Sequence, residues 1–228
     1  MRSGTAAWGW LAAILLLGAV AGCGSGGDGD EAASGDPTPT TAASPTMVPG
    51  GCEVPPAPTA EPDYGDPTEP ELRDELLAMF EADQAERTGD GPITDDADRT
   101  DRLREIIEDY GWPTRRMVGV DGATAAWVIA QHSDHDVDFQ REALALMCQA
   151  AAAGEADVTE LAYLVDRVAV NSDQPQIYGT QVGPCEDGRP VPQPLWDEAR
   201  VDERRARVGL EPLADYLAQF EEGCASGG

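Results

Sequence analysis

Residues 121–130 read DGATAAWVIA, a stretch whose side chains are small or apolar in nearly every direction around a helix. Asp121 is of a residue type that caps helix N-termini, so we expect a helix that begins there and runs through Trp127 and Ile129. A helix that is apolar on nearly every face is one that other elements surround. The stretch therefore predicts the central helix of a helical domain.

Two amphipathic helices precede the central one. Thr68 and Glu71 form a capping-box pattern before an apolar stripe that ends near Gly89. A second stripe of the same period stops at Gly111. The apolar residues are Leu72, Leu76, Met79 and Phe80 in the first stripe, and Leu103, Ile106, Ile107 and Tyr110 in the second.

Two further helices follow the central one. The first begins at Asp136 and ends at Gly154, and the second begins at another capping pattern, Asp157 with Glu160. Their apolar residues are Phe139, Ala143, Leu146, Met147 and Ala150 in the first, and Leu161, Leu164, Val165 and Val168 in the second. Both stripes have the helical period.

The segment after these helices changes character. Residues 176–181 have no helical period, and Asp187-Gly188 with several prolines predicts a small β-hairpin or an irregular arm. Two helices then close the domain, one over about residues 197–208 and one with the apolar residues Leu213, Tyr216, Leu217 and Phe220. The predicted fold class is mainly α: a single multi-helix domain over residues 71–222 that carries this arm, followed by a C-terminal tail over 223–228.

Several strings of the domain occur in the order found in a known family. They are Gly111-Trp112-Pro113-Thr114, Gln131-His132-Ser133-Asp134-His135-Asp136, Phe139-Gln140, Tyr163, Asp166-Arg167, Pro175-Gln176, Tyr178-Gly179-Thr180-Gln181, Val201-Asp202-Glu203-Arg204-Arg205 and Gly209-Leu210. Through these strings the chain resembles the bacterial domain of unknown function 6624, over about residues 100–220. The resemblance implies a shared domain and marks polar positions, but that family has no assigned activity to transfer.

The N-terminal sequence predicts that the protein is exported from the cytoplasm. A basic residue, Arg2, precedes the apolar run Leu11–Val20, a pattern typical of a secretory signal peptide over residues 1–22. Val20-Ala21-Gly22-Cys23 resembles a bacterial lipobox, in which Cys23 becomes the acylated mature N-terminus. Two or more acyl chains, such as palmitate, would hold the protein stably at the cell membrane, on its extracytoplasmic face. The alternative is an uncleaved membrane helix, although the run barely reaches the length of a span.

Residues 23–70 predict a lipidated cysteine followed by a disordered tether. Between residues 24 and 70 the chain has ten prolines, nine acidic residues and no basic residue. Such a segment buries too little apolar surface to offset its ordering entropy.

Charge and composition exclude several classes of function. The net charge of −28 excludes nucleic acid as a partner, because phosphate binding needs a basic surface. The chain has no lysine, so all 15 positive charges are arginine. This absence excludes P-loop, Schiff-base and protein-kinase chemistry, each of which needs a lysine.

The two histidines lie three positions apart, so any histidine-based mechanism must use the segment 131–136. His132 ends one predicted helix and His135 precedes the next, which places both imidazoles at one tip of a helical hairpin. With Asp136 they could hold a divalent metal or act as catalytic groups. The alternative is local: His132 favours a helix C-terminus, and Asp134 or Asp136 caps the next helix.

The arm is the second candidate site. We expect the polar groups of Gln176, Tyr178, Thr180 and Gln181 to be exposed and to line a groove for a peptide or a sugar, with Gln131 as a further binding residue. The alternative is a turn in which Tyr178 only packs. Asp166 and Arg167 are expected to form a structural ion pair or to be solvated.

Four cysteines, Cys52, Cys148, Cys185 and Cys224, remain after lipidation of Cys23. In an oxidising compartment an even number predicts disulfides, and four cysteines allow three pairings between which the sequence does not choose. Cys148 lies on an apolar helix face and could instead be a buried free thiol.

Two functions from different classes follow. The first, which we favour, is a membrane-anchored extracytoplasmic lipoprotein that presents a helical binding domain in the cell envelope to a protein, a peptide or a glycan. The alternative is an envelope hydrolase, metal-assisted or with a histidine base, that uses His132, His135 and Asp136. No cofactor other than such a divalent metal is indicated.

Overall fold

The computed structural model describes residues 51–60, 62–89 and 96–226, which belong to one compact unit. This part of the chain is helical and contains isolated β-bridges instead of a sheet, so the predicted fold class is confirmed. Its elements are α1 Pro70–Thr88, α2 Asp96–Tyr110, α3 Arg115–Gln131, α4 Val137–Ala152, α5 Val158–Val170, the 3-10 turn η1 Glu198–Arg200, α6 Val201–Arg207, α7 Leu213–Ala218 and α8 Glu221–Ser226.

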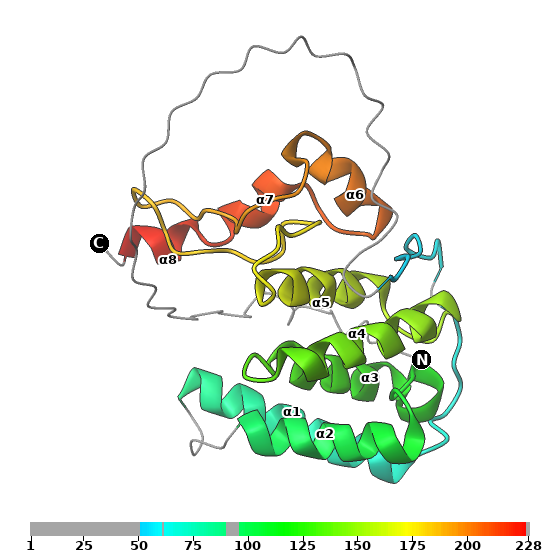
Figure 1. The fold of residues 1–228 in the computed structure, drawn as a ribbon. Helices are drawn as coiled ribbons and strands as arrows, with labels where there is room; N and C mark the ends of the chain where they lie inside the picture. Colours follow the sequence, from blue (N-terminus) through cyan, green and yellow to red (C-terminus); the bar gives the residue numbers. More distant parts are fainter. Residues whose placement is uncertain (1–50, 61, 90–95, 227–228) are drawn as a thin grey trace, which may run out of the picture. The chain divides into compact units, whose positions relative to one another are not determined.

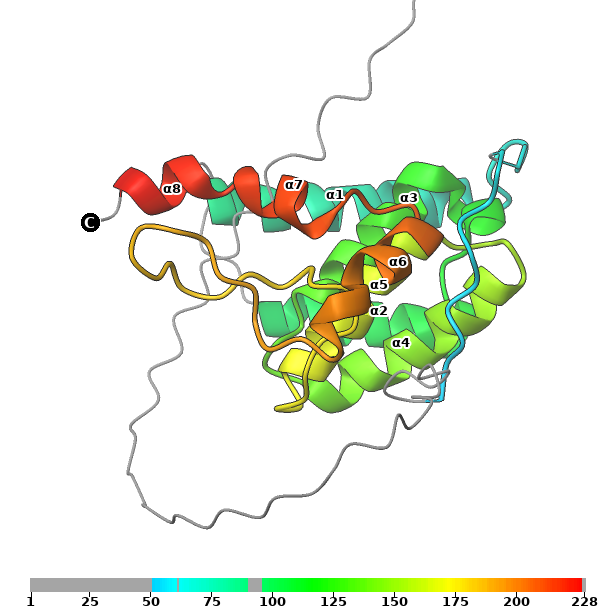
Figure 2. The same ribbon diagram turned by 90° about the horizontal axis from the view of Figure 1, so that it is seen from above.

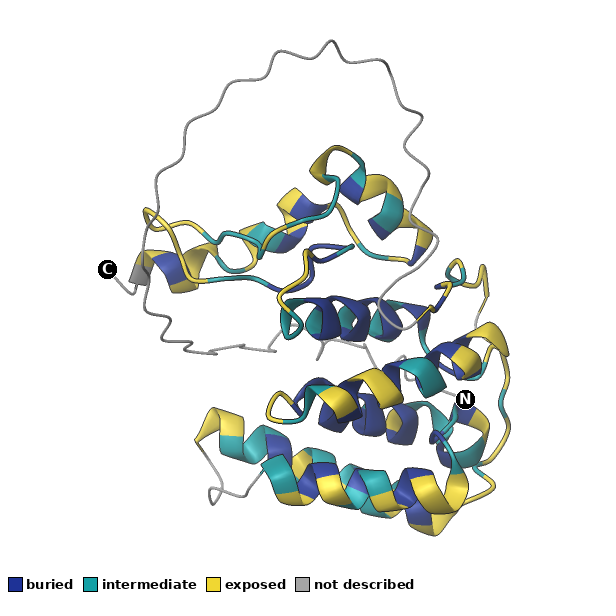
Figure 3. Cartoon of the chain, in the orientation of Figure 1, coloured by how far each residue is buried: buried dark blue, intermediate teal, exposed yellow. Residues whose placement is uncertain are grey.

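Helix α3 is the central element, as its composition predicts. It packs against α1 and α2 on one side and against α4 and α5 on the other (Figure 1). Every residue from Ala125 to Gln131 is buried, whereas α1 and α2 each keep an exposed face (Figure 3). The C-terminal helices α6 and α7 lie beyond α5, on the side away from α1 and α2 (Figure 1), and seen from above α6 crosses in front of α5 (Figure 2).

Two predicted helix caps are wrong. Helix α3 begins at Arg115, where the Thr114 side chain accepts a hydrogen bond from Met117 N, and its backbone is interrupted at Gly119, whose φ and ψ are 74° and 174°. Asp121 lies two residues after this interruption, and its carboxylate binds the guanidinium of Arg73. The capping box predicted at residues 68–71 is also absent, because α1 begins with Pro70 and without a side-chain cap.

The next two starts are confirmed. The Asp136 carboxylate accepts a hydrogen bond from Phe139 N at 2.9 Å and caps α4. The Asp157 carboxylate accepts from Thr159 N and Glu160 N at 2.7 and 3.0 Å and caps α5. Helices α3, α4 and α5 are thereby joined by short, defined turns.

The arm is irregular. Between α5 and η1 the backbone forms only three isolated bridges, Gln176 with Leu195, Val182 with Pro192 and Glu186 with Arg189. The predicted tail at 223–228 is a wrong boundary, because α8 continues to Ser226 and Cys224 forms a disulfide with Cys185. This disulfide thus connects α8 to the arm.

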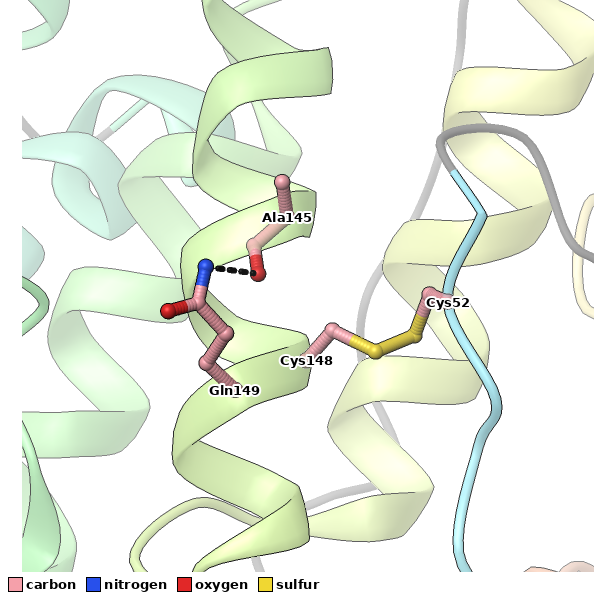
Figure 4. The surroundings of a disulfide bond; sticks show 4 residues. All are labelled: Cys52, Ala145, Cys148 and Gln149. Atoms are coloured by element: carbon pink, nitrogen blue, oxygen red, sulfur yellow. Dashed lines mark hydrogen bonds between the residues drawn. A yellow bond between two sulfur atoms is a disulfide. The ribbon is translucent and has the colours of Figure 1, made fainter.

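Helix α1 begins at Pro70, close to the predicted start of the helical domain, but the residues before it are not the disordered tether that we expected. Residues 51–60 and 62–69 run along the domain, where Cys52 and Val54 are buried and Ala57 N donates to Arg207 O. Cys52 forms a disulfide with Cys148 of α4, so Cys148 is not a free thiol (Figure 4). A disulfide across 96 residues contributes about 4 to 5 kcal/mol in the chain-entropy model. The sequence did not predict that the segment before α1 packs on the domain, because this segment has no apolar period.

The predicted signal peptide, Cys23 and the first part of the predicted tether lie outside the described residues. Within the described ranges, no helix is both long and apolar enough to span a membrane.

Candidate functional site

His132 lies at the C-terminal end of α3 and faces α1. Its Nδ1 is 2.9 Å from both carboxylate oxygens of Asp83, and neither side chain is more than 3% exposed. The guanidinium of Arg87 lies beside the pair, with Nε 3.2 Å from Asp83 Oδ1 and 2.9 Å from His132 Nδ1. Nδ1 cannot both donate to the carboxylate and accept from Arg87. All three groups are satisfied when Nδ1 carries the proton and Asp83 accepts from both neighbours.

This environment sets the ionisation of Asp83. Burial alone would raise the pKa of its carboxyl group, but the hydrogen bond with His132 and the neighbouring Arg87 outweigh burial and hold the pKa below its ordinary value. The carboxylate therefore orients the imidazole through Nδ1 and leaves Nε2 as the basic nitrogen, which is the arrangement of a general base.

The structure does not bring the three predicted catalytic or metal-binding residues together. His135 is exposed, whereas His132 is turned toward α1. Asp136 is occupied as the cap of α4 and as the partner of Arg104, at 2.6 Å. Across the described residues there is no group of three or more histidine, cysteine, aspartate or glutamate side chains that could hold a metal ion.

Arg167 of α5 joins the histidine turn to the arm. Its guanidinium makes a two-point ion pair with Asp134, at 2.8 and 2.6 Å, and its Nη1 donates to Gln181 Oε1 at 3.0 Å. Asn171 and Gln140 complete the group, because the Asn171 amide donates to Asp134 at 2.8 Å and to Gln140 at 2.9 Å. We call Gln131, Asp134, Gln140, Arg167, Asn171 and Gln181 the Arg167 cluster. Arg167 thus forms a structural ion pair, as expected, and its partner is Asp134.

The Arg167 cluster reaches the surface. Asp134 is 48% exposed and Arg167 is 14% exposed, whereas Gln140 is fully buried. The sequence analysis treated residues 131–136 and 176–181 as separate candidates. In the structure Arg167 of α5 contacts both regions, and its partner Asp134 is exposed to solvent.

The prediction that the arm is exposed is wrong. Gln176 and Thr180 are fully buried, and Gln181 and Tyr178 are only 2% and 6% exposed. The cause is Asp166, whose fully buried carboxylate accepts from the backbone N–H groups of residues 177, 178 and 180 and from Thr180 Oγ1, at 2.7 to 3.2 Å. Burial raises the pKa of Asp166, and these donors oppose that effect.

Two further residues hold the arm from the C-terminal side. Arg205, which is fully buried, donates from Nη1 to Tyr178 O at 2.8 Å, and Tyr216 Oη donates to Thr180 O at 2.9 Å. These hydrogen bonds thus hold the arm in place, and the Gln181 side chain of the arm contacts Arg167.

One side chain of the Arg167 cluster stands apart from the rest. Gln131 is 2% exposed, and its Oε1 is buried without a hydrogen-bond partner. One turn earlier on the same face of α3, Trp127 Nε1 is also buried without a partner. Almost all buried polar atoms in proteins are hydrogen-bonded, so two such atoms on one helix face mark a place where a partner is missing.

Sequence reasoning missed Asp83 and Arg167 as site residues. Asp83 lies 49 residues before its partner, with no local signal that connects them. Arg167 stood in one of the strings that support the family resemblance, so it could have been considered together with Gln131 and Gln181.

Comparison with known proteins identifies a single family. A family model described as a family of unknown function (DUF6624) matches residues 70–226. No curated protein and no solved structure matches the chain.

Proposed function

Because the chain belongs to the DUF6624 family, whose function is unknown, we propose its role from its own residues: a membrane-anchored extracytoplasmic lipoprotein that presents this helical domain as a binding module in the cell envelope. The binding site is the Arg167 cluster. The partner is an envelope protein, a peptide or a glycan.

The observation that carries this proposal is the unpartnered side-chain oxygen of Gln131. Around it the side chains of Asp134, Gln140, Arg167 and Gln181 each have a hydrogen-bond partner. A network with a purely structural role would be expected to satisfy the buried side-chain oxygen of Gln131 as well. The missing partner and the exposure of Asp134 together support a site that is completed by a ligand.

The anchor rests on the lipobox pattern before Cys23. Replacing Cys23 by Ala should abolish incorporation of a metabolic fatty-acid label and release the protein from the membrane fraction, because the thiol is the acyl acceptor. Labelled protein that persists in the Cys23→Ala variant would refute the anchor.

The binding role is tested by photo-crosslinking in cells of the source organism. We expect a photoreactive phenylalanine at the exposed position His135, beside the Arg167 cluster, to form a discrete adduct. The same residue at Tyr110, which is 50% exposed on α2, is the matched control and should form none. Absence of an adduct at His135, or equal adducts at both positions, would contradict the proposed site.

A second function is favoured by one observation, the pairing of His132 with Asp83. That geometry is what an envelope hydrolase with a histidine base would use, with Asp83 orienting Nδ1 and Nε2 taking a proton from the attacking group. His132 itself is 4% exposed, so a substrate would need access to a nearly closed site. For that reason we place binding first.

A further inference from the structure

The chemistry of the ligand follows from the atoms that lack partners, on the premise that the Arg167 cluster is the binding site. Trp127 Nε1 is a donor and Gln131 Oε1 is an acceptor, and both are buried. They lie four residues apart on α3, so they share one face of the helix. A group that satisfies both must offer one acceptor and one donor.

Helix α5 packs against this face of α3. The two α5 residues concerned, Tyr163 and Arg167, are also four positions apart. The Trp127 ring lies edge-on to the Tyr163 ring, with centroids 6.1 Å apart, and the backbone oxygen of Gln131 accepts from Arg167 Nε at 3.3 Å. The Trp127 ring thus contacts Tyr163, and the Gln131 backbone contacts Arg167. Both α5 side chains are partly exposed, so the two unpartnered atoms lie near side chains that reach the surface.

The charge at this seam disfavours an ionic ligand. The Arg167 guanidinium is already neutralised by the two-point pair with Asp134. Tyr163 belongs to an aromatic row that continues through Tyr216 to Phe220, which favours a neutral ligand with an apolar side.

We propose that the seam between α3 and α5 binds a secondary amide, whose carbonyl accepts from Trp127 Nε1 and whose N–H donates to Gln131 Oε1. A peptide bond and the N-acetyl group of an amino sugar both supply this chemistry. An ester of the same shape lacks the N–H and would leave Gln131 unsatisfied.

The test uses the full chain after the signal peptide, with Cys23→Ser to keep it free of lipid. Trp112, Trp127 and Trp196 are its three tryptophans, so the indole N–H signals are few, and Trp127→Phe assigns the one at issue. N-methylacetamide should shift the Trp127 signal and bind about tenfold more tightly than methyl acetate, its ester counterpart. In Gln131→Met, which keeps the volume but removes the acceptor, that preference should disappear.

Two larger probes distinguish the sources of the amide. A lower half-saturating concentration for N-acetylglucosamine would assign a glycan, and a lower one for N-acetylalanine N-methylamide would assign a peptide. A Trp127 signal that responds to none of the three amides, or an equal response to amide and ester, would overturn the proposal.

Stability without ligand provides a second criterion. Because Gln131 Oε1 has no partner, Gln131→Met, which keeps the volume, should leave the melting temperature unchanged or raise it slightly. A clear fall in this variant would show that an internal water already satisfies the atom, which would also overturn the proposal. The His135 crosslink is independent: if it forms while no amide binds, only the ligand class is wrong.

Discussion

Replacing Asp166 by Ala should lower the free energy of unfolding by about 4 kcal/mol or more, which would be the largest effect of any single exposed or buried carboxylate in the domain. The fully buried carboxylate is the acceptor for three backbone N–H groups and for the Thr180 hydroxyl. Its removal leaves these donors buried and unpaired, each at a cost of about 1 to 3 kcal/mol before relaxation. Urea denaturation followed by circular dichroism measures the loss.

Two controls separate this role from a general effect of charge. Asp166→Asn keeps the shape and one acceptor oxygen, so it should cost about half as much as the Ala variant. Asp138 is 92% exposed and paired with Arg141, and Asp138→Ala should change stability by less than about 0.5 kcal/mol. An Asp166→Ala variant as stable as Asp138→Ala would show that the arm is not held by this carboxylate.

Asp83→Asn should be the second large change, with a loss of about 3 kcal/mol at neutral pH. The reason is that the charges of Arg87 and Arg99 and the imidazole of His132 lose the buried carboxylate that they share. The pKa of Asp83 is lowered in the folded protein, so the unfolded chain binds the proton more tightly and stability rises with pH. The contribution is complete above the ordinary carboxyl pKa and is lost as the pH falls through the lowered one.

The parent should therefore lose stability in acid more steeply than Asp83→Asn, and unfolding free energies between pH 2 and 7 measure the two slopes. Asp109→Asn, at an exposed position of α2, is the control and should follow the parent. Parallel slopes in parent and Asp83→Asn would contradict the assignment. If the histidine is also a catalytic base, Asp83→Asn should lower hydrolysis of a probe ester about 10³- to 10⁴-fold.

The helical architecture was predictable because its signals are local. The apolar composition of residues 123–130 indicates a central helix, and Asp136 and Asp157 stand where caps are needed. The start of α3 was not predictable in the same way. The backbone of Gly119 is not helical and interrupts α3, and the side-chain cap of α3 is Thr114, seven residues before the Asp121 at which we expected it.

The candidate site was only partly predictable, because its decisive contacts are long-range. Gln131 and Gln181 were identified from their residue types, yet only the folded chain shows that Arg167 joins them through Asp134. The polar residues of the arm suggested exposure. A carboxylate with four donors reverses that expectation, since Asp166 allows polar backbone to be buried at little cost. Cys52 was placed in a tether for a similar reason, because its partner Cys148 is distant in sequence.

The central claim is that the Arg167 cluster is a binding site with one partner missing at Gln131. The most direct measurement is the yield of the His135 photo-adduct in cells, compared between the parent and the Gln131→Met variant, together with the melting temperature of each purified protein. We expect the adduct to fall about tenfold while the melting temperature stays the same, because the variant removes only the unpartnered acceptor. An adduct of equal yield in both proteins would contradict the claim.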